Sequence, residues 1–200
     1  MILKEIVDIS VGYPFRGKIL EQSGSGTHVI QMKDIALENS LIDWGRVTET
    51  ELTGKKKPYF LKVGDVLVAA RGNHNYAVTI GAMAEHFNAV ASPHFYVLSD
   101  FYGKLQPEYL KWFINSGPSQ RYFKKEAEGS VAKSIRRPVL ENLPIPVPSM
   151  EKQEVVVSMI VAMLDEEMKL RLLSHNNKLM MNLIAKDLIK ESTQEIQQND

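Results

Sequence analysis

Side chains with hydrogen-bonding, cationic and aromatic groups gather in two loops of this sequence. The first loop, Arg71–Tyr76, reads Arg-Gly-Asn-His-Asn-Tyr and follows a continuous apolar run, Val66–Ala70. These residue types supply the donors, acceptors and flat faces that read the edges of bases. The second loop, residues 130–137, is basic and follows Gly129. We predict that both loops contact nucleic acid. For the first loop the alternative is a polar turn whose Asn and Gly residues only satisfy backbone geometry.

Other cations stand in turns where they could follow a phosphate backbone. Two flank the glycine of Phe15-Arg16-Gly17-Lys18, three form a triplet before Pro58, and two lie in a helix predicted over residues 119–127. For each group the alternative is a solvated surface. The full set of predicted DNA contacts is Arg16, Lys18, Lys55, Lys56, Lys57, Arg71, Asn73, His74, Asn75, Tyr76, Lys124, Lys125, Ser130, Lys133, Arg136 and Arg137.

The net charge of the chain is zero, which argues against a simple DNA-binding protein because phosphate contact favours a basic face. The distribution of charge weakens this objection. The first 150 residues carry 18 Lys and Arg against 15 Asp and Glu, whereas the last 50 carry 6 against 9. Six cations fall within residues 121–137 against two acids, so positive charge is concentrated in one region.

Residues for catalysis or metal binding do not form a recognisable set. The chain has no cysteine, which excludes disulfides and thiolate zinc sites. His28, His86 and His94 are spaced irregularly, and we expect them to be structural or surface histidines. Asp34 and Asp65 have no paired acid in the sequence. We therefore expect a non-catalytic binding module with no metal and no cofactor of its own.

The hydrophobic pattern predicts an α+β domain with a mixed sheet and small helices. Apolar residues at helical spacing predict a short amphipathic helix over residues 2–9. Strands are predicted over residues 27–35, 66–70, 77–83 and 89–99, the last interrupted at Ser92-Pro93-His94. Helices are predicted over residues 107–116 and 119–127. The first polar loop then lies at the end of a buried strand.

A stiff connector precedes the last quarter of the chain. Pro138 suits the first turn of a one-turn helix, and the alternate prolines of Leu143–Pro148 forbid helix and remove ladder donors. Ser149 then offers an N-cap for a long helix, with Glu151 near its positive end. We therefore place a boundary here, between a domain of residues 1–148 and a helix of residues 149–200.

The predicted helix contains no proline or glycine, and helix formers dominate it. An apolar stripe recurs at steps of three and four, an eleven-residue repeat that favours nearly straight or slightly right-handed pairing. This stripe includes Val161, Leu164, Met168, Leu172, His175, Leu179 and Leu183. A second stripe includes Val156, Ile160, Met163, Leu170, Met181, Ile184 and Leu188.

So much apolar surface requires a partner helix, because one small domain cannot bury it. We expect the partner to be a second copy of the chain, paired as an antiparallel coiled coil that forms a homodimer. The polar run His175-Asn176-Asn177 could fix the register of this pairing, as buried asparagine does in coiled coils. The alternative for this run is an exposed kink.

The order of several motifs resembles the target recognition domain of type I restriction–modification specificity subunits. The motifs are Gly12-Tyr-Pro-Phe15-Arg-Gly17, Gly64-Asp65-Val-Leu67, Pro107-Glu-Tyr-Leu110 and Leu140-Glu-Asn-Leu143-Pro-Ile145-Pro-Val-Pro148, with Gln153 after them. The resemblance covers nearly the whole chain. It implies that residues 1–148 are a DNA-binding domain and residues 149–200 a helical spacer. The usual subunit carries two of each, whereas this chain has room for one, so it resembles a half-length form.

The resemblance further implies partners. The target would be a bipartite double-stranded DNA sequence, and an inverted repeat if two copies pair. A methyltransferase (modification) subunit would bind the chain and would itself hold S-adenosylmethionine, and a restriction subunit would join them.

Two alternatives stay open: half of a split subunit that pairs with a different half, and a protein-interaction module that does not bind DNA. The sequence shows neither a membrane-spanning run nor a secretory pattern, so we expect a cytoplasmic protein.

Overall fold

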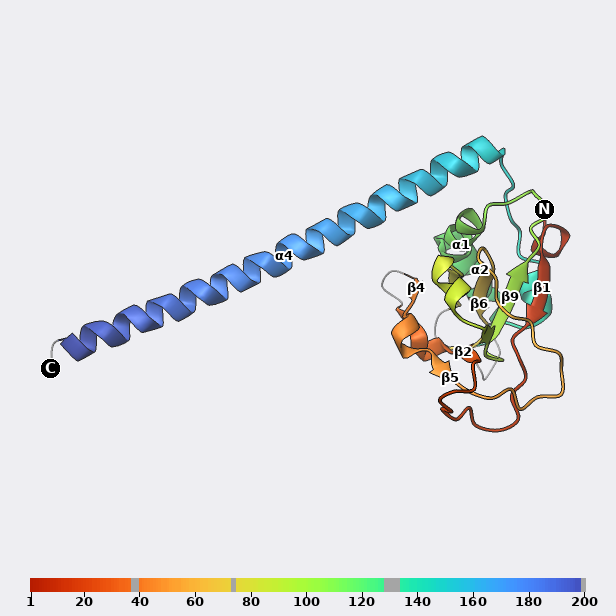
Figure 1. Ribbon diagram of the computed structural model, residues 1–200. Coiled ribbons are helices and arrows are strands. Elements are labelled where there is room, and N and C mark those ends of the chain that lie inside the picture. Colours follow the sequence, from red (N-terminus) through yellow and green to blue (C-terminus); the bar gives the residue numbers. More distant parts are fainter. Residues whose placement is uncertain (37–39, 73–74, 128–133, 199–200) are drawn as a thin grey trace. The chain divides into compact units, whose positions relative to one another are not determined.

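The structure is a computed structural model that describes residues 1–36, 40–72, 75–127 and 134–198, with side chains in the last helix described as far as Ile189. The chain forms two units, Met1–Val157 and Ser158–Asp200 (Figure 1). The first unit combines sheets with small helices, and the second consists of one long helix. The predicted α+β fold class is confirmed.

A four-stranded antiparallel sheet lies at the centre of the first unit. Its strand order is β1 (Asp8–Val11), β9 (Phe95–Ser99), β6 (Val66–Ala69) and β7 (Ala77–Thr79). Every side chain of β6 is buried, as its continuous apolar sequence predicts. Val11 lies opposite Tyr96, and Ala69 lies opposite Phe95. The last residues of β1 and β6 therefore flank the first residues of β9 at one end of the strands.

A smaller sheet has the order β5 (Thr48–Glu49), β2 (His28–Ile30) and β8 (Ala89–Ala91), with β2 parallel to β8. A separate two-stranded ladder joins β3 (Ile35–Ala36) to β4 (Leu41–Ile42). The interruption predicted at Ser92–His94 is confirmed as the point where the chain passes from the smaller sheet to the central one. Pro93 has no N–H to continue a ladder.

Short 3-10 helices replace parts of the predicted elements. The helix predicted over residues 2–9 is wrong: η1 (Leu3–Glu5) is a single turn, and β1 follows it. Pairing of β1 with β9 outweighs the local helical spacing. The strands predicted over residues 27–35 and 77–83 are shorter than expected, because η2 (Met32–Asp34) and η4 (Ala82–His86) follow β2 and β7. A fourth turn, η3 (Trp44–Arg46), precedes β5.

Two predicted helices, α1 (Pro107–Asn115) and α2 (Gly117–Ala127), are present, and α1 packs beside β7. Asn115 at the end of α1 covers this edge strand: its Oδ1 accepts from the Ala77 N–H (2.7 Å) and its Nδ2 donates to the Ala77 carbonyl (2.9 Å). The predicted one-turn helix at Pro138 is α3 (Arg137–Glu141).

Strand β6 supplies both hydrophobic cores because successive side chains of a strand point to opposite faces. Val66 and Val68 pack on one face with α1 and with Leu143 of the proline-rich connector. Leu67 and Ala69 pack on the other face with residues of the smaller sheet. The central sheet is therefore covered on both sides, and its functional groups can reach solvent only at its ends.

The connector after α3 is held by the first residues of the chain and by Gln153. The Leu3 N–H donates to the Leu143 carbonyl (3.0 Å), and the Ile145 N–H donates to the Met1 carbonyl (2.8 Å). Gln153 is fully buried, and its Nε2 donates to the carbonyls of Lys104 (2.9 Å) and Pro148 (3.0 Å). Its Oε1 accepts from the N–H of Gln106 (2.9 Å). One side chain thus fixes both the connector and the loop before α1.

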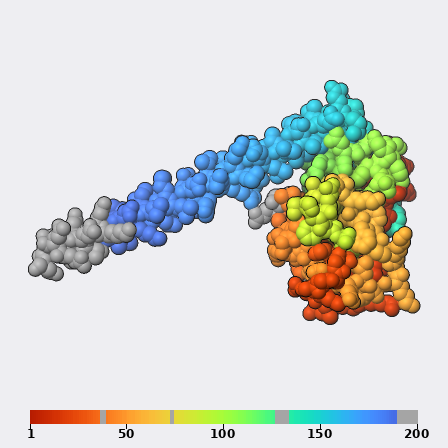
Figure 2. Space-filling view, in the orientation of Figure 1, coloured from red at the N-terminus to blue at the C-terminus, as the bar shows by residue number. Residues whose placement is uncertain are grey.

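The predicted long helix is α4 (Met150–Gln198). Its first turns belong to the first unit, where Val156 and Val157 pack on the core. In the second unit (Figure 2) the described side chains from Val161 to Ile189 are all exposed, so the first predicted stripe is exposed throughout. Of the second predicted stripe, Val156 and Ile160 are partly buried and the other members are exposed. Among the described residues, no helix combines the length and apolar character required to cross a bilayer.

Substitution of Gln153 tests how strongly this side chain holds the first unit together. Gln153→Ala leaves two carbonyls and one N–H without their partner, and we expect a loss of about 2–4 kcal/mol in the free energy of unfolding. Urea denaturation of the full chain measures it. Lys152→Ala, at the exposed neighbouring position, is the control and should change stability by less than about 0.5 kcal/mol. Equal stability of the two variants would contradict this role.

Candidate nucleic-acid interface

Five segments that are distant in the sequence meet where the strands of both sheets end, and we call them the convergent edge. They are residues 12–13, 31–32, 70–72, 92–94 and 134–136. The crossing between the sheets holds the segments together, since the Ser92 N–H donates to the Ile30 carbonyl (2.9 Å) and the Ala70 N–H donates to the His94 carbonyl (2.8 Å). The ends of β2 and β6 are thereby brought to the same place.

Gly12 lets the end of β1 join this edge. The Gly12 N–H donates to the Phe95 carbonyl (3.0 Å), and the Tyr13 N–H donates to the Ala91 carbonyl (2.8 Å). A Cβ atom on Gly12 would lie 2.0 Å from the Ser92 carbonyl oxygen. No side chain fits this approach, so the first predicted motif contains a glycine for a packing reason.

The two loops predicted to contact nucleic acid are neighbours at the convergent edge. Arg71 and Ser134 form an isolated antiparallel bridge, and the Ile135 N–H donates to the Ala70 carbonyl (3.0 Å). Arg71 therefore lies beside the segment that carries Arg136.

The three arginines of these loops differ in what they already bind. Arg137 is engaged: its Nε lies 2.7 Å from Glu141 Oε1, and its Nη2 donates to the Ile9 carbonyl (3.0 Å). Arg71 and Arg136 are exposed and form no side-chain hydrogen bond or ion pair with the described residues. These two guanidinium groups are available to bind an anion such as a phosphate.

Tyr96 of β9 supports the second of these loops. Its hydroxyl donates to the Ile135 carbonyl (3.3 Å). Burial raises the pKa of Tyr96, and the positive charges of Arg137 and Arg71 partly offset this rise. The ring therefore stays neutral and serves as a hydrogen-bonded support for the convergent edge.

Other residues of the first predicted loop are turned toward the domain. Asn75 Nδ2 donates to the Ala69 carbonyl (2.9 Å), and the Asn75 carbonyl accepts from Gln120 Nε2 (2.9 Å). The Tyr76 hydroxyl is buried with no hydrogen-bond partner among the described residues, and burial together with Asp34 raises its pKa to about 12. Both side chains thus position the loop. The predicted contacts Asn73, His74, Ser130 and Lys133 lie outside the described residues.

The remaining predicted cations form two exposed groups. The Arg16 N–H donates to Thr53 Oγ1 (2.9 Å), and the Tyr13 hydroxyl donates to the Gly54 carbonyl (2.7 Å). These bonds place the turn with Arg16 and Lys18 beside the Lys55–Lys57 triplet, next to residues 12–13. Lys124 and Lys125 are exposed one turn beyond Gln120 on α2.

Sequence reasoning missed polar residues at the convergent edge. His94 is exposed, as the prediction of a structural or surface histidine allows, but its place beside Ala70 and the first loop was not predicted. Gln31 and Lys33 follow the end of β2, within a region predicted as continuous strand. The strand ends early because Asp34 Oδ2 accepts from the Gln31 N–H (2.8 Å) and closes a turn. Pro93 was the one sequence signal that could have pointed to His94, because a proline within a predicted strand marks the end of that strand and so the start of a loop.

Comparison with known proteins identifies relatives of this domain. A family model described as the type I restriction modification DNA specificity domain matches residues 1–192. No curated protein matches the chain.

Two of the solved structures that match the chain show its fold. One is a chain from a structure of the type I R-M system that addresses complex assembly and conformational transition, with a TM-score of 0.60 and 18% identity over 84% of this chain. The other is the HsdS subunit from Thermoanaerobacter tengcongensis, with a TM-score of 0.55 and 18% identity over 82% of this chain. This chain spans 38% and 36% of their respective lengths.

A substitution at Gly72 tests the geometry beside Arg71. Gly72 has a φ of +104°, and a Cβ atom there would lie 2.9 Å from Met32 Cε. We expect Gly72→Ala to lower the free energy of unfolding by about 1–3 kcal/mol, because left-handed backbone is strained for alanine. Gly81→Ala is the matched control, since Gly81 has a φ of −86° and open space around its Cβ position. Equal chemical denaturation midpoints for both variants would contradict this geometry.

Proposed function

Because the chain belongs to the family of type I restriction modification DNA specificity domains, we propose that it is the non-catalytic unit that directs a type I restriction–modification enzyme to a DNA sequence. The observation that carries the proposal is the convergent edge, where the Arg71 and Arg136 side chains are exposed and form no hydrogen bond or ion pair with the described residues. Such guanidinium groups bind phosphates and the edges of guanine.

Residues 1–148 would read one half of a split double-stranded target. The exposed side chains of the convergent edge, such as Arg71, His94 and Arg136, would enter a groove of the duplex. The exposed cations of the Arg16–Lys18 turn and the Lys55–Lys57 triplet lie beside it and would follow the phosphate backbone. In this arrangement local positive charge supplies affinity even though the whole chain is neutral.

The first apolar stripe of α4 would pair antiparallel with a second copy of the chain. Its members Leu164, Met168, Leu172 and Leu179 are exposed, and they recur on one side of the helix. A two-fold pair would place two identical recognition domains a fixed distance apart, so the target would be an inverted repeat with a fixed gap. A different half-subunit in place of the second copy is the alternative, and it predicts an asymmetric target.

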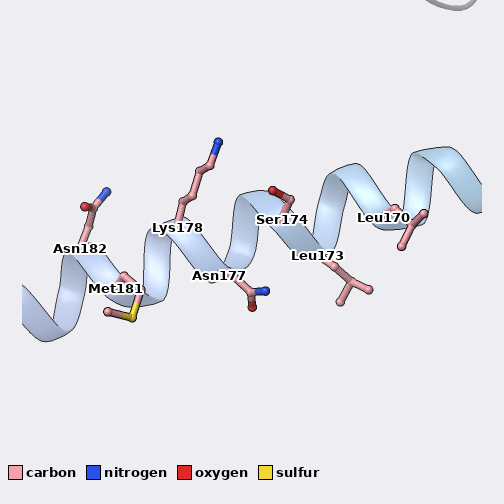
Figure 3. A pocket seen from close by; sticks show the side chains of 7 residues that line it. All are labelled: Leu170, Leu173, Ser174, Asn177, Lys178, Met181 and Asn182. Carbon is pink, nitrogen blue, oxygen red and sulfur yellow. The ribbon is translucent and has the colours of Figure 1, made fainter.

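The second apolar stripe lies on the opposite side of α4. At about 100° per residue, Leu170 and Met181 point about 160–180° away from Leu172. Figure 3 shows the central part of α4, where the side chains of Leu170, Leu173, Asn177 and Met181 lie on one side of the helix and those of Ser174, Lys178 and Asn182 on the other. Two opposed apolar stripes require two partners, and we assign the second to the methyltransferase (modification) subunit. That subunit would hold S-adenosylmethionine, and a restriction subunit would join the same complex.

The DNA-binding proposal predicts the effect of removing either free guanidinium group. Arg71→Ala or Arg136→Ala should weaken binding to a specific duplex by about 1–3 kcal/mol, the scale of a good base or charged contact. Fluorescence anisotropy at several salt concentrations measures this, with Lys152→Ala as a control that removes one exposed positive charge elsewhere. Unchanged affinity in both arginine variants would overturn the assignment of this edge. Binding without a steep salt dependence would instead favour the protein-interaction alternative.

The pairing proposal predicts the mass of the chain in solution. The full chain should be a dimer by light scattering at micromolar concentration, and Leu172→Asp should be a monomer because a carboxylate would enter the apolar contact. Ala162→Asp adds the same charge between the two stripes and should remain a dimer. A truncation at Ser149 is unsuitable because it also removes Gln153 from the first unit. A monomeric wild-type chain would contradict pairing with a second copy.

A further inference from the structure

Gln31, Lys33 and Thr48 form a polar cluster at the end of β2 that has no place in the sequence-based set of DNA contacts. Gln31 Nε2 donates to Thr48 Oγ1 (3.1 Å), and Lys33 Nζ donates to the same oxygen (2.9 Å). One hydroxyl on β5 therefore holds two long side chains beside each other. Lys33 keeps 54% of its side chain exposed, and Gln31 is partly exposed.

The backbone beneath this cluster is fixed by a buried carboxylate. Asp34 is fully buried, and its Oδ2 accepts from the Gln31 N–H (2.8 Å). Thr48 lies opposite Val29 in the β2–β5 ladder, so the support of the cluster is a strand pair. Long side chains that are already held in one conformation lose less conformational entropy on binding. This preorganisation favours selective contacts.

The cluster is continuous with the convergent edge. The Ile30 carbonyl, directly before Gln31, accepts from the Ser92 N–H (2.9 Å). Met32 lies against Gly72, because its Cε is 2.9 Å from the position of a Gly72 Cβ atom. A duplex that contacts Arg71 would therefore also come close to Gln31 and Lys33.

We propose that Gln31 and Lys33 determine the base preference of this domain, with Gln31 reading adenine and Lys33 reading guanine in the major groove. The proposal rests on the DNA-binding function above. A glutamine amide offers a donor and an acceptor that match N7 and N6 of adenine, whereas a lysine ammonium donates to O6 and N7 of guanine. A neutral amide binds phosphate more weakly than a cation does, but it can donate to one atom of a base and accept from another, which favours base contact for Gln31.

Selection from a pool of randomised duplexes tests this directly with the full chain. Wild type should enrich sequences with an adenine at one position and a guanine at a nearby position. Gln31→Glu should change the first preference from adenine to cytosine, because a carboxylate accepts from N4 of cytosine. Lys33→Gln should change the second preference from guanine to adenine. Each exchange should alter selectivity at its own position by about tenfold or more.

Lys152→Gln is the charge-matched control, because it lowers the net charge by one, as Gln31→Glu and Lys33→Gln do. Lys152 is exposed at the start of α4, and its side chain lies outside the Gln31–Lys33–Thr48 cluster. This variant should enrich the same sequences as wild type. Thermal unfolding of each variant confirms that selection compares folded proteins.

Each result separates this inference from the function on which it rests. If wild type enriches a sequence and Gln31→Glu and Lys33→Gln enrich the same one, the inference is overturned while DNA recognition stands. If wild type enriches no sequence and does not bind the pool, both are overturned. Gln31→Glu could lose all binding because its carboxylate repels phosphate, and Gln31→Ala then provides the test. Gln31→Ala should bind DNA without the adenine preference. A retained adenine preference in Gln31→Ala would overturn the inference.

Discussion

The crossing at Ser92–His94 is the constraint on which the arrangement of the functional edge depends. Ser92 bonds the end of β2, His94 bonds Ala70 after β6, and Gly12 approaches Ser92 more closely than any side chain permits. Because Pro93 cannot extend a ladder, the chain leaves one sheet here and enters the other. The ends of β1, β2 and β6 are thereby gathered at one place, while the faces of the central sheet remain buried in two cores.

The two units of the chain carry different kinds of binding surface. In the first unit the exposed functional groups are cationic and polar, and buried side chains such as Gln153 and Asp34 hold the loops beneath them. In the second unit the described surface is rich in exposed Leu, Ile and Met on two opposed sides of one helix. The first kind of surface suits a polyanion, and the second suits apolar helices of other chains. In the function that we propose, this division separates recognition of DNA from assembly of the complex.

Local patterns in the sequence predicted some elements well and others poorly, for physical reasons. Three elements were predicted well because neighbouring residues determine them. The continuous apolar run predicted the buried β6, the alternate prolines predicted the extended connector, and the long stretch of helix formers predicted α4. The amphipathic helix over residues 2–9 failed because pairing of β1 with β9 is a long-range interaction. Composition singled out the polar loop Arg71–Tyr76 and the basic loop 130–137 as candidates, but it could not predict that Arg71 pairs with Ser134, because the two segments are distant in the sequence. Gln31 and Lys33 were missed because a side-chain bond from Asp34 ends β2.

Hydrogen exchange of the full chain, measured by mass spectrometry with and without duplex DNA, tests the central claim most directly. The account predicts slower exchange on DNA addition in peptides that cover residues 12–18, 31–34, 70–72, 92–94 and 134–137, which are joined only in the folded structure. Peptides from the middle of α4 should be unaffected by DNA alone. Unchanged exchange in the first set, or protection confined to α4, would contradict the assignment of the convergent edge as the DNA-binding surface.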